Sequence, residues 1–552
     1  MTRPMNRRTF IVLGGTAAAT AATTLNQPAW ATVAPTVAQP SLPADPFTLG
    51  VSSGDPLSDS VVLWTRLAPN PIDGGGMPDR RYDVRWQVAT DDRFRQIIRS
   101  GNAKAEPEFG HSVHADVRGL RPGHAYYYRF RVDDHVSPIG RTRTAPSRDA
   151  QPSSLRWAFA SCQNFQDGFY TAYDHLAAED LAFVAFLGDY IYESNPNPNA
   201  VRTHDGTGEP FSLVDYRNRH ARYRSDASLQ AAHAAHPWIV TLDDHEIDNN
   251  WADDIPQDPQ NQTPEAFRAR RIAAFQAYYE HMPLRRSSLP DGPDMQLYRR
   301  MDFGDLVRVS VLDTRQYRSD QVATEAEAWD PSRSMTGDEQ ERWLLQSLRK
   351  SDARWNVLAN QLMWAQNDRR AGPERVFDFD NWDGYRAQRK RLLTAMGAVR
   401  NPIIMTGDRH ATWACDLKPD FDDEASPVVG AEITGSSVSS GGNPNVEAFH
   451  QTFDPIKAES PHWKFIDNQR GYVLLDADRS RIELSLRVVE TVVQPTAPIT
   501  TYARLVVEDQ VPGITLVDEA ARPAAPAYDA DRRFIPGPNG PLRLDRGQPY
   551  HG

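Results

Sequence analysis

Short apolar runs alternate with longer polar stretches from residue 155 onward. The clearest runs occupy residues 155–162, 182–189, 237–246, 306–315, 355–364 and 402–411. Nearly continuous apolar runs of this length are typical of strands that are covered on both faces, as in layered α/β sheets. The pattern therefore predicts an α/β domain over residues 155–510.

Helices and further strands complete this predicted domain. The stretches 264–282 and 338–350, which lie between apolar runs, have the length and composition of helices. Three later apolar runs, at residues 428–435, 471–478 and 481–490, are expected to add strands to the sheets.

Residues 45–144 have a different pattern of apolar and polar residues. The runs "SVVLWTRL", "YDVRWQVAT" and "HAYYYRFRV" are short, alternating or aromatic, and Gly, Pro and Asp turns separate them. This favours a small β-sandwich. The stretch "GLRPGHAYYYRFRV" is similar to the fibronectin-type pattern in which a tyrosine closes the corner before a late strand. Residues 145–154 then read as a linker, and residues 511–552, rich in Pro, Gly, Asp and Arg, as a C-terminal tail.

Polar residues follow four of the apolar runs at the point where each strand is expected to end. In chain order they include Cys162, Asp189, Tyr192, Asp243, Asp244, His245, Glu246, Asp408, Arg409 and His410. Functional groups of open α/β sheets gather at the carboxyl ends of the strands, so these distant clusters can converge on one site.

The residue types in these clusters restrict the ligand that they would hold. A set of Cys, Asp, Tyr and His is too hard for a thiolate zinc site and too soft for an all-oxygen calcium site. Phenolate and thiolate together favour ferric iron, while the remaining carboxylates suit a harder divalent ion, calcium or manganese. A mixed site needs a bridging carboxylate, and Asp189 is the best placed candidate.

Composition and charge narrow the classes of function. A chain of 552 residues with 24% charged residues is expected to form at least two domains of a globular enzyme. Its net charge is -12 and no Lys/Arg tract lies beyond the N-terminus, which argues against a nucleic-acid partner. An acidic protein still binds phosphate esters where metal ions supply the positive charge.

The first 31 residues have the features of a twin-arginine export signal. Arg7 and Arg8 precede Phe10 and a modestly apolar stretch, which ends in a small-x-small cleavage pattern at residues 29–31. The expected partner of this segment is the twin-arginine export machinery, and the expected location is periplasmic or secreted. No other run is long enough to span a membrane, so we expect a mature form that does not do so.

Taken together, the motifs resemble the alkaline phosphatase D (PhoD) family. The resemblance is carried by "FASCQ", "GDYIYE", "DDHE", "NQLMW" and "TGDRHA", behind the export signal and "GVSSGDP". That family is similar to purple acid phosphatases and calcineurin-like metallophosphoesterases. The resemblance implies a metallophosphoesterase-type α/β sandwich behind a small fibronectin-like β-sandwich. It also implies hydrolysis of phosphate mono- or diesters by a metal-bound hydroxide at a mixed iron/calcium site.

The resemblance also implies roles for individual residues. The implied ligands of Fe3+ are Cys162, Asp189, Tyr192 and His410. Asp189 would bridge to the second ion, Ca2+ or Mn2+, with Asp244 and Asp408 as further ligands.

Two residues are assigned catalytic roles. Arg409 carries a guanidinium that stays protonated, and its fork suits two oxygens of the substrate phosphate. His245 is the second catalytic candidate, and the sequence leaves open whether it binds a metal ion or supports the ligands.

Alternatives to this interpretation remain at the level of sequence. Secreted phospholipase D enzymes share the signature, so phospholipid diesters are a second substrate class. A non-catalytic exported binding protein is a third reading, against which the intact ligand positions argue. The pairs His111/His114 and His233/His236 lack carboxylate neighbours in sequence and are predicted to be surface histidines, and Cys415 is predicted to be a buried thiol.

Overall fold

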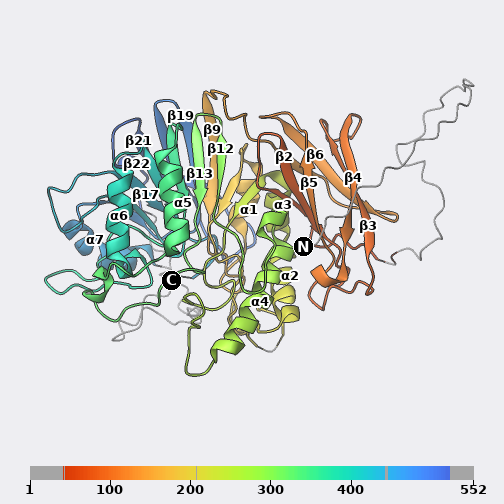
Figure 1. Ribbon diagram of the computed structural model, residues 1–552, viewed down its shortest axis with the longest axis horizontal. Helices are drawn as coiled ribbons and strands as arrows, with labels where there is room; N and C mark the ends of the chain where they lie inside the picture. The colour runs from red at the N-terminus through yellow and green to blue at the C-terminus, as the bar shows by residue number, and fades with distance from the viewer. Residues whose placement is uncertain (1–41, 43, 207, 442–444, 523–552) are drawn as a thin grey trace, which may run out of the picture. The chain divides into compact units, whose positions relative to one another are not determined.

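Two β-sheets pack against each other, and helices cover the outer face of each (Figure 1). The computed structural model describes residues 42, 44–206, 208–441 and 445–522. The predicted export signal, residues 1–31, lies outside the described residues, as does the C-terminal part of the predicted tail.

The larger sheet has ten strands, and most of its central strands run parallel. Its spatial order is β22 (Thr515–Glu519), β21 (Ile499–Glu508), β20 (Arg481–Val489), β19 (Gly471–Asp478), β9 (Ser154–Ala160), β10 (Val184–Phe186), β11 (Pro237–Val240), β1 (Val51–Gly54), β2 (Ser60–Arg66) and β5 (Ser112–Arg118). Helices α1 (Thr171–Ala178), α2 (Leu213–Arg224), α3 (Ala227–Ala235) and α4 (Pro264–His281) share a hydrophobic cluster with one face of this sheet.

The second sheet has seven strands around a parallel centre. Its order is β12 (Arg299–Phe303), β13 (Val307–Val311), β14 (Trp355–Ala359), β15 (Pro402–Thr406), β17 (Gly430–Thr434), β16 (Thr412–Leu417) and β18 (Trp463–Asp467). Helices α5 (Gly337–Arg349), α6 (Arg386–Met396) and α7 (Val446–Glu459) cover its outer face. The central core lies between the two sheets and includes Trp157, Phe159, Val309, Val357 and Ile403.

These elements confirm the predicted α/β sandwich. Each of the six apolar runs contains a strand, and α4 and α5 match the predicted helical stretches to within a residue at each end. Local chemistry explains the start of α4, because the Thr263 side chain accepts a hydrogen bond from the Ala266 N–H at 3.2 Å and Pro264 occupies the first turn.

The N-terminal β-module is less separate than the sequence suggests. A five-stranded sheet, of β4 (Ile97–Ala105), β3 (Tyr82–Ala89), β6 (Ala125–Val132), β7 (His135–Val136) and β8 (Gly140–Arg143), forms one half of it. The other half is β1, β2 and β5. Of these, β1 pairs with β11, β2 pairs with β1 and β5 pairs with β2, so all three strands belong to the ten-stranded sheet. The sequence could not reveal this pairing, because the partner strand β11 lies more than a hundred residues away.

A tyrosine closes the corner before β6, as the sequence pattern predicts. The hydroxyl of Tyr126 accepts a hydrogen bond from the Arg121 N–H at 2.9 Å and lies 3.3 Å from the Arg121 carbonyl.

At the other end of the chain, strand β22 lies within the predicted C-terminal tail. The sheet therefore extends beyond the expected boundary at residue 510.

Three of the four histidines predicted at the surface are buried, so that prediction is wrong for them. His111, His233 and His236 are 6%, 0% and 1% exposed. Each ring has hydrogen-bond partners in the interior, which a neutral imidazole needs in order to be buried at little cost. Cys415 is buried in the core beside α7 and β18, as predicted.

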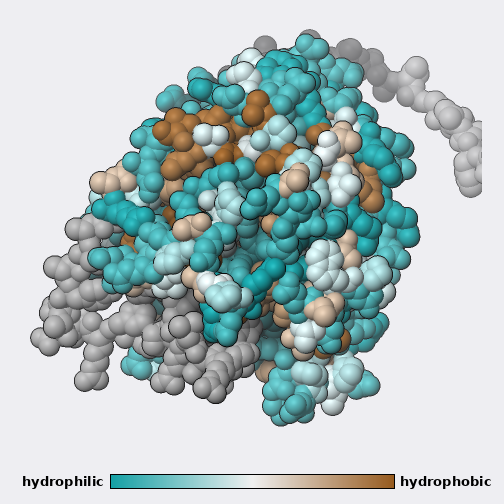
Figure 2. Space-filling model, turned by 90° about the vertical axis from the view of Figure 1, so that its left-hand side faces the viewer, coloured by the Kyte–Doolittle hydropathy of each residue, from teal (hydrophilic) through white to brown (hydrophobic). Residues whose placement is uncertain are grey.

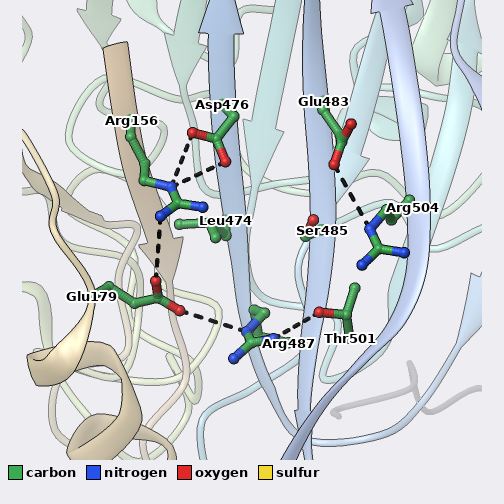
Figure 3. A pocket seen from close by; sticks show the side chains of 9 residues that line it. All are labelled: Arg156, Glu179, Leu474, Asp476, Glu483, Ser485, Arg487, Thr501 and Arg504. Atoms are coloured by element: carbon green, nitrogen blue, oxygen red, sulfur yellow. Dashed lines mark hydrogen bonds and ion pairs between the residues drawn. The ribbon is translucent and has the colours of Figure 1, made fainter.

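Two features stand out on the surface. Figure 2 shows a patch of hydrophobic residues on the side that lies at the left of Figure 1. On β9, β19, β20 and β21, an open pocket of 280 Å³ is lined by arginines that pair with carboxylates, such as Arg156 with Asp476 (Figure 3). Its charges are therefore already compensated by one another. None of the helices within the described residues is long and apolar enough to cross a membrane.

Candidate metal centre

Four loops that follow strand ends bring the predicted site residues together. Cys162 follows β9, Asp189 and Tyr192 follow β10, Asp244 and His245 follow β11, and His410 follows β15. The first three strands are parallel neighbours in one sheet, and β15 lies in the other. The site thus lies where the two sheets present the carboxyl ends of their strands.

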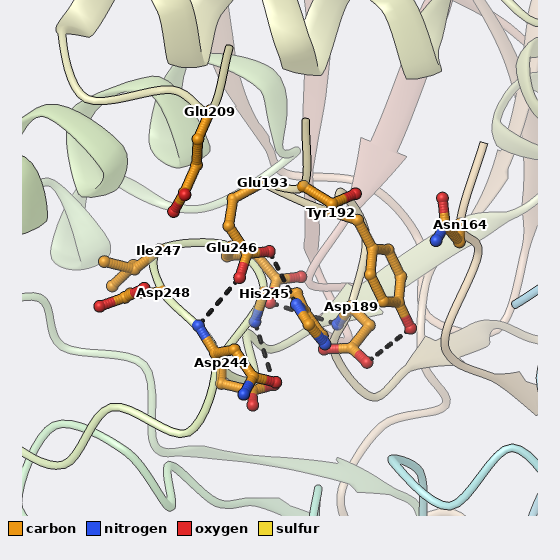
Figure 4. A network of polar contacts seen from close by, with 12 residues as sticks. Asn164, Asp189, Tyr192, Glu193, Glu209, Asp244, His245, Glu246, Ile247 and Asp248 are labelled. Carbon is orange, nitrogen blue, oxygen red and sulfur yellow. Dashed lines mark hydrogen bonds and ion pairs between the residues drawn. The ribbon is translucent and has the colours of Figure 1, made fainter. Parts of the chain in front are cut away.

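The four predicted iron ligands lie close together. One ligand atom each of Cys162, Asp189 and His410 lies within 4.8 Å of the other two, and all three side chains are buried. The Tyr192 hydroxyl donates to Asp189 Oδ2 at 2.8 Å (Figure 4) and lies 2.9 Å from His410 Nε2. These four residues come from three loops and form one compact group.

Asp189 also belongs to a second group. Its carboxylate, a carboxylate oxygen of Asp244 and a ring nitrogen of His245 again lie within 4.8 Å of one another. The Asp189 carboxylate therefore lies between the two groups, where a carboxylate that bridges two metal ions would lie. Asp408 is half-buried and does not belong to either three-residue group of the described residues. Burial and the neighbouring Asp243 nevertheless raise the pKa of Asp408 well above its usual value.

The backbone at these positions is in an unusual conformation. Cys162, Asp189, Asp408 and His410 have φ values of 59°, 57°, 65° and 50°. Non-glycine residues in the left-handed region cost on the order of 1 kcal/mol each or more, and such residues cluster at functional sites. Here the conformation occurs where the chain leaves β9, β10 and β15.

Glu246 and Gly441 hold two of these loops in place. The Glu246 carboxylate accepts the backbone N–H groups of Asp189 at 3.2 Å, Tyr190 at 2.6 Å and Asp243 at 2.8 Å. The Nδ1–H of His410 donates to the Gly441 carbonyl. That bond fixes the tautomer that leaves Nε2 free of a proton, as a metal-binding imidazole requires.

The electrostatics of the group fit a bound cation. Burial, and then the neighbouring Asp189, raise the pKa of the Cys162 thiol and of the Tyr192 phenol well above their usual values. Burial lowers the pKa of His410 to about 3, so its ring is neutral. Asp189 Oδ1 is buried and has no hydrogen-bond partner among the described residues. A metal ion would supply both the missing partner and the positive charge that lets these acids ionise.

The His245 ring is held in place by Glu193 and Tyr192. Its Nδ1 lies 2.7 Å from Glu193 Oε2, and its ring stacks on Tyr192 with centroids 4.2 Å apart (Figure 4). Burial would lower the pKa of His245, but Glu193, Asp244 and Asp189 raise it well above the usual value. One of its ring nitrogens lies within 4.8 Å of carboxylate oxygens of Asp189 and Asp244.

Arg409 is only partly available to a substrate. Its side chain is almost fully buried, donates from Nη1 to Asp378 at 2.9 Å and lies over the Trp413 ring. Its Nε has no hydrogen-bond partner among the described residues. The predicted phosphate contact would therefore use the N–H groups that Asp378 leaves free.

The sequence interpretation missed a second buried arginine. Arg315 donates from Nε to Asp243 at 2.6 Å and pairs with Asp244 at 3.5 Å and Asp380 at 3.0 Å. It compensates charge that would otherwise accumulate in the centre. A signal was present, because Arg315 follows the apolar run of β13 just as the predicted ligands follow theirs. In a third acidic group, formed by Glu193, Glu209 and Asp248, Arg270 pairs with Glu209 and Asp248.

The chain is an α/β sandwich whose strand ends carry carboxyl, thiol, phenol and imidazole groups. Together the fold and the site indicate a metal-dependent hydrolase. Comparison with known families agrees with this class. Residues 157–486 match the family model described as PhoD-like phosphatase, and residues 32–146 match its N-terminal domain.

Two relatives support the same assignment. Alkaline phosphatase D of Bacillus subtilis (strain 168) is 48% identical over 493 residues, which cover 87% of this chain and 84% of the relative. A solved structure of PhoD is 47% identical and superposes with a TM-score of 0.83, covering 88% of this chain and 94% of that chain. The chain therefore belongs to the PhoD-like phosphatase family. It is a hydrolase of phosphate esters.

Proposed function

We propose that this chain is an exported, metal-dependent phosphoesterase that hydrolyses phosphate mono- or diesters at a mixed site for Fe3+ and Ca2+ or Mn2+. The observation that carries the proposal is the arrangement around Asp189, which belongs to two ligand groups at once. A single carboxylate shared by two groups is what a two-ion site requires.

The donor sets differ between the two groups, which supports two different ions. Cys162, Tyr192 and His410 add soft or phenolic donors to Asp189 and would hold the iron. Asp244, with Asp408 as a further ligand, adds oxygen donors and would hold the harder divalent ion. When bound, such ions supply positive charge that lowers the pKa of an attacking water and neutralises the phosphate oxygens.

The protein's own residues then bind the phosphate and move the proton. The N–H groups of Arg409 that do not contact Asp378 would donate to phosphate oxygens and hold the group in place. His245, kept protonated by Glu193 at 2.7 Å, would give a proton to the leaving oxygen. The stacking of His245 on Tyr192 fixes the ring for this transfer.

Export by the twin-arginine machinery is part of the proposal. It rests on Arg7, Arg8 and the cleavage pattern at residues 29–31. The substrate would accordingly be a phosphate ester outside the cytoplasm, whether a small molecule, a lipid or a polymer.

Elemental analysis combined with a substrate panel tests the proposal. We expect the purified protein to contain iron together with calcium or manganese, and a chelator to abolish hydrolysis. The panel should include a phosphate monoester, a small diester and a phospholipid, because hydrolysis of the phospholipid alone would favour a phospholipase D. A metal-free or zinc-only protein with full activity would contradict the proposed centre.

A further inference from the structure

Tyr190 stands between two candidate ligands but contacts a different set of residues. Its hydroxyl lies 2.8 Å from His233 Nε2 and accepts a longer hydrogen bond, at 3.4 Å, from Arg224. The Tyr192 hydroxyl, two residues later, contacts Asp189 and His410 instead. Tyr190 and Tyr192 belong to the same loop, but their hydroxyl groups contact two separate sets of residues.

The contacts of Tyr190 lead to the N-terminal module. His233, in α3, lies 2.8 Å through Nδ1 from the hydroxyl of Ser52, in β1. The His233 ring stacks on Trp238, in β11, with centroids 3.8 Å apart. Ser52, His233 and Tyr190 are all fully buried. Two hydrogen bonds therefore connect strand β1 with the loop that carries Asp189 and Tyr192, and we call these three residues the relay.

The direction of the hydrogen bonds in the relay follows from charge. Burial, together with Arg224, lowers the pKa of His233 well below its usual value, so the ring is neutral and one nitrogen donates while the other accepts. Because Arg224 donates to the Tyr190 oxygen, Tyr190 gives its own proton to His233 Nε2. The Nδ1–H of His233 then donates to Ser52.

The backbone of Tyr190 is held as firmly as its side chain. Its N–H donates to Glu246 at 2.6 Å, and its carbonyl accepts from Gln163 at 2.8 Å. The preceding residue, Asp189, has a φ of 57°. A non-glycine residue keeps such a conformation only where the surroundings fix it from several directions. Tyr190 is fixed at three points, and the relay supplies one of them.

We propose that Ser52, His233 and Tyr190 are positioning residues of the metal centre, through which the N-terminal strand β1 holds Asp189 and Tyr192 in place. The inference rests on the proposed function, since it concerns the same ligands. It gives the N-terminal module a role in the chemistry of a site to which it contributes no candidate ligand.

Metal release measures this role separately from folding. Tyr190→Phe and Ser52→Ala each remove one hydroxyl from the relay and keep the remaining shape. Tyr278→Phe is the matched control, because Tyr278 is buried in the same hydrophobic cluster and its hydroxyl has no hydrogen-bond partner among the described residues. The rate at which each full-length, metal-loaded protein gives up metal to a chelator is compared with the thermal unfolding of the same variants stripped of metal.

We expect both relay variants to release metal roughly fivefold faster than the control, the equivalent of one hydrogen bond. The Ser52→Ala/Tyr190→Phe double variant should be no faster than the faster single variant, because both changes break one relay. Relay variants that lower the unfolding temperature but release metal at the control's rate would overturn this inference alone. A wild-type protein without bound metal would overturn the proposed function and this inference with it.

Discussion

Replacing Glu193 by glutamine removes the negative charge that lies beside His245 and raises its pKa, while it preserves the shape of the side chain. Glu193 Oε2 lies 2.7 Å from His245 Nδ1, and Glu193 Oε1 accepts the Asn249 N–H at 2.9 Å. Both oxygens therefore receive a hydrogen bond. A glutamine amide has only one acceptor oxygen, so one of these two donors loses its partner in Glu193→Gln.

The size of the effect follows from the kind of bond that is lost. A hydrogen bond between charged, buried groups contributes about 1.5–3 kcal/mol. The same free energy, withdrawn from the protonated form of His245, lowers its pKa by about 1–2 units. We expect Glu193→Gln to reduce turnover roughly 10- to 100-fold on a substrate whose leaving group needs a proton.

A comparison of leaving groups tests the proposed role of His245. An alkyl phosphate releases an alkoxide, which needs a proton, whereas p-nitrophenyl phosphate releases a stable anion. Glu193→Gln should therefore impair hydrolysis of the alkyl ester much more than that of the nitrophenyl ester. Glu209→Gln is the matched control, because Glu209 belongs to the same acidic group but pairs with Arg270. Equal losses on both substrates would refute proton donation by the Glu193–His245 pair.

Three further predictions concern the phosphate, the export signal and the N-terminal module. Arg409→Ala should keep its metal content but lose about 2–4 kcal/mol of transition-state stabilisation in kcat/KM, as for other positioned donors; loss of the metals in elemental analysis would instead assign Arg409 a structural role. Changing Arg7 and Arg8 to lysine should leave unprocessed protein inside the cell on an immunoblot, and normal export of this variant would reject the twin-arginine assignment. Tyr126→Phe should lower the free energy of unfolding by about 1 kcal/mol, because it removes the corner hydrogen bond to Arg121; denaturant unfolding equal to wild type would show that the corner contributes nothing.

The strands and the convergence of the site could be predicted because they depend on local patterns. Apolar runs mark strands whatever their partners, and the polar residues after them gather where the strands end. Cys162, Asp189, Tyr192 and His410 were each identifiable in this way, although they come from three separate loops.

What could not be predicted depends on partners that are distant in the chain. The join between β1 and β11, and the burial of His233 by Ser52 and Tyr190, involve contacts that leave no local pattern. Arg315 follows the apolar run of β13, which is a local signal, but its pairing with Asp243, Asp244 and Asp380 depends on segments that are distant in the chain. Glu193 reads as an ordinary loop residue until His245 is placed beside it.

The visible absorption spectrum of the purified protein, compared with that of Tyr192→Phe, tests the central claim most directly. A phenolate bound to ferric iron absorbs visible light by charge transfer, so we expect a coloured wild-type protein that contains iron. Tyr192→Phe removes only the oxygen that lies 2.8 Å from Asp189 and 2.9 Å from His410, and the band should shift or vanish. Cys162→Ser belongs in the same series, because a thiolate on iron also absorbs. A colourless, iron-free and active wild-type protein, or a spectrum that Tyr192→Phe leaves unchanged, would contradict the proposed centre.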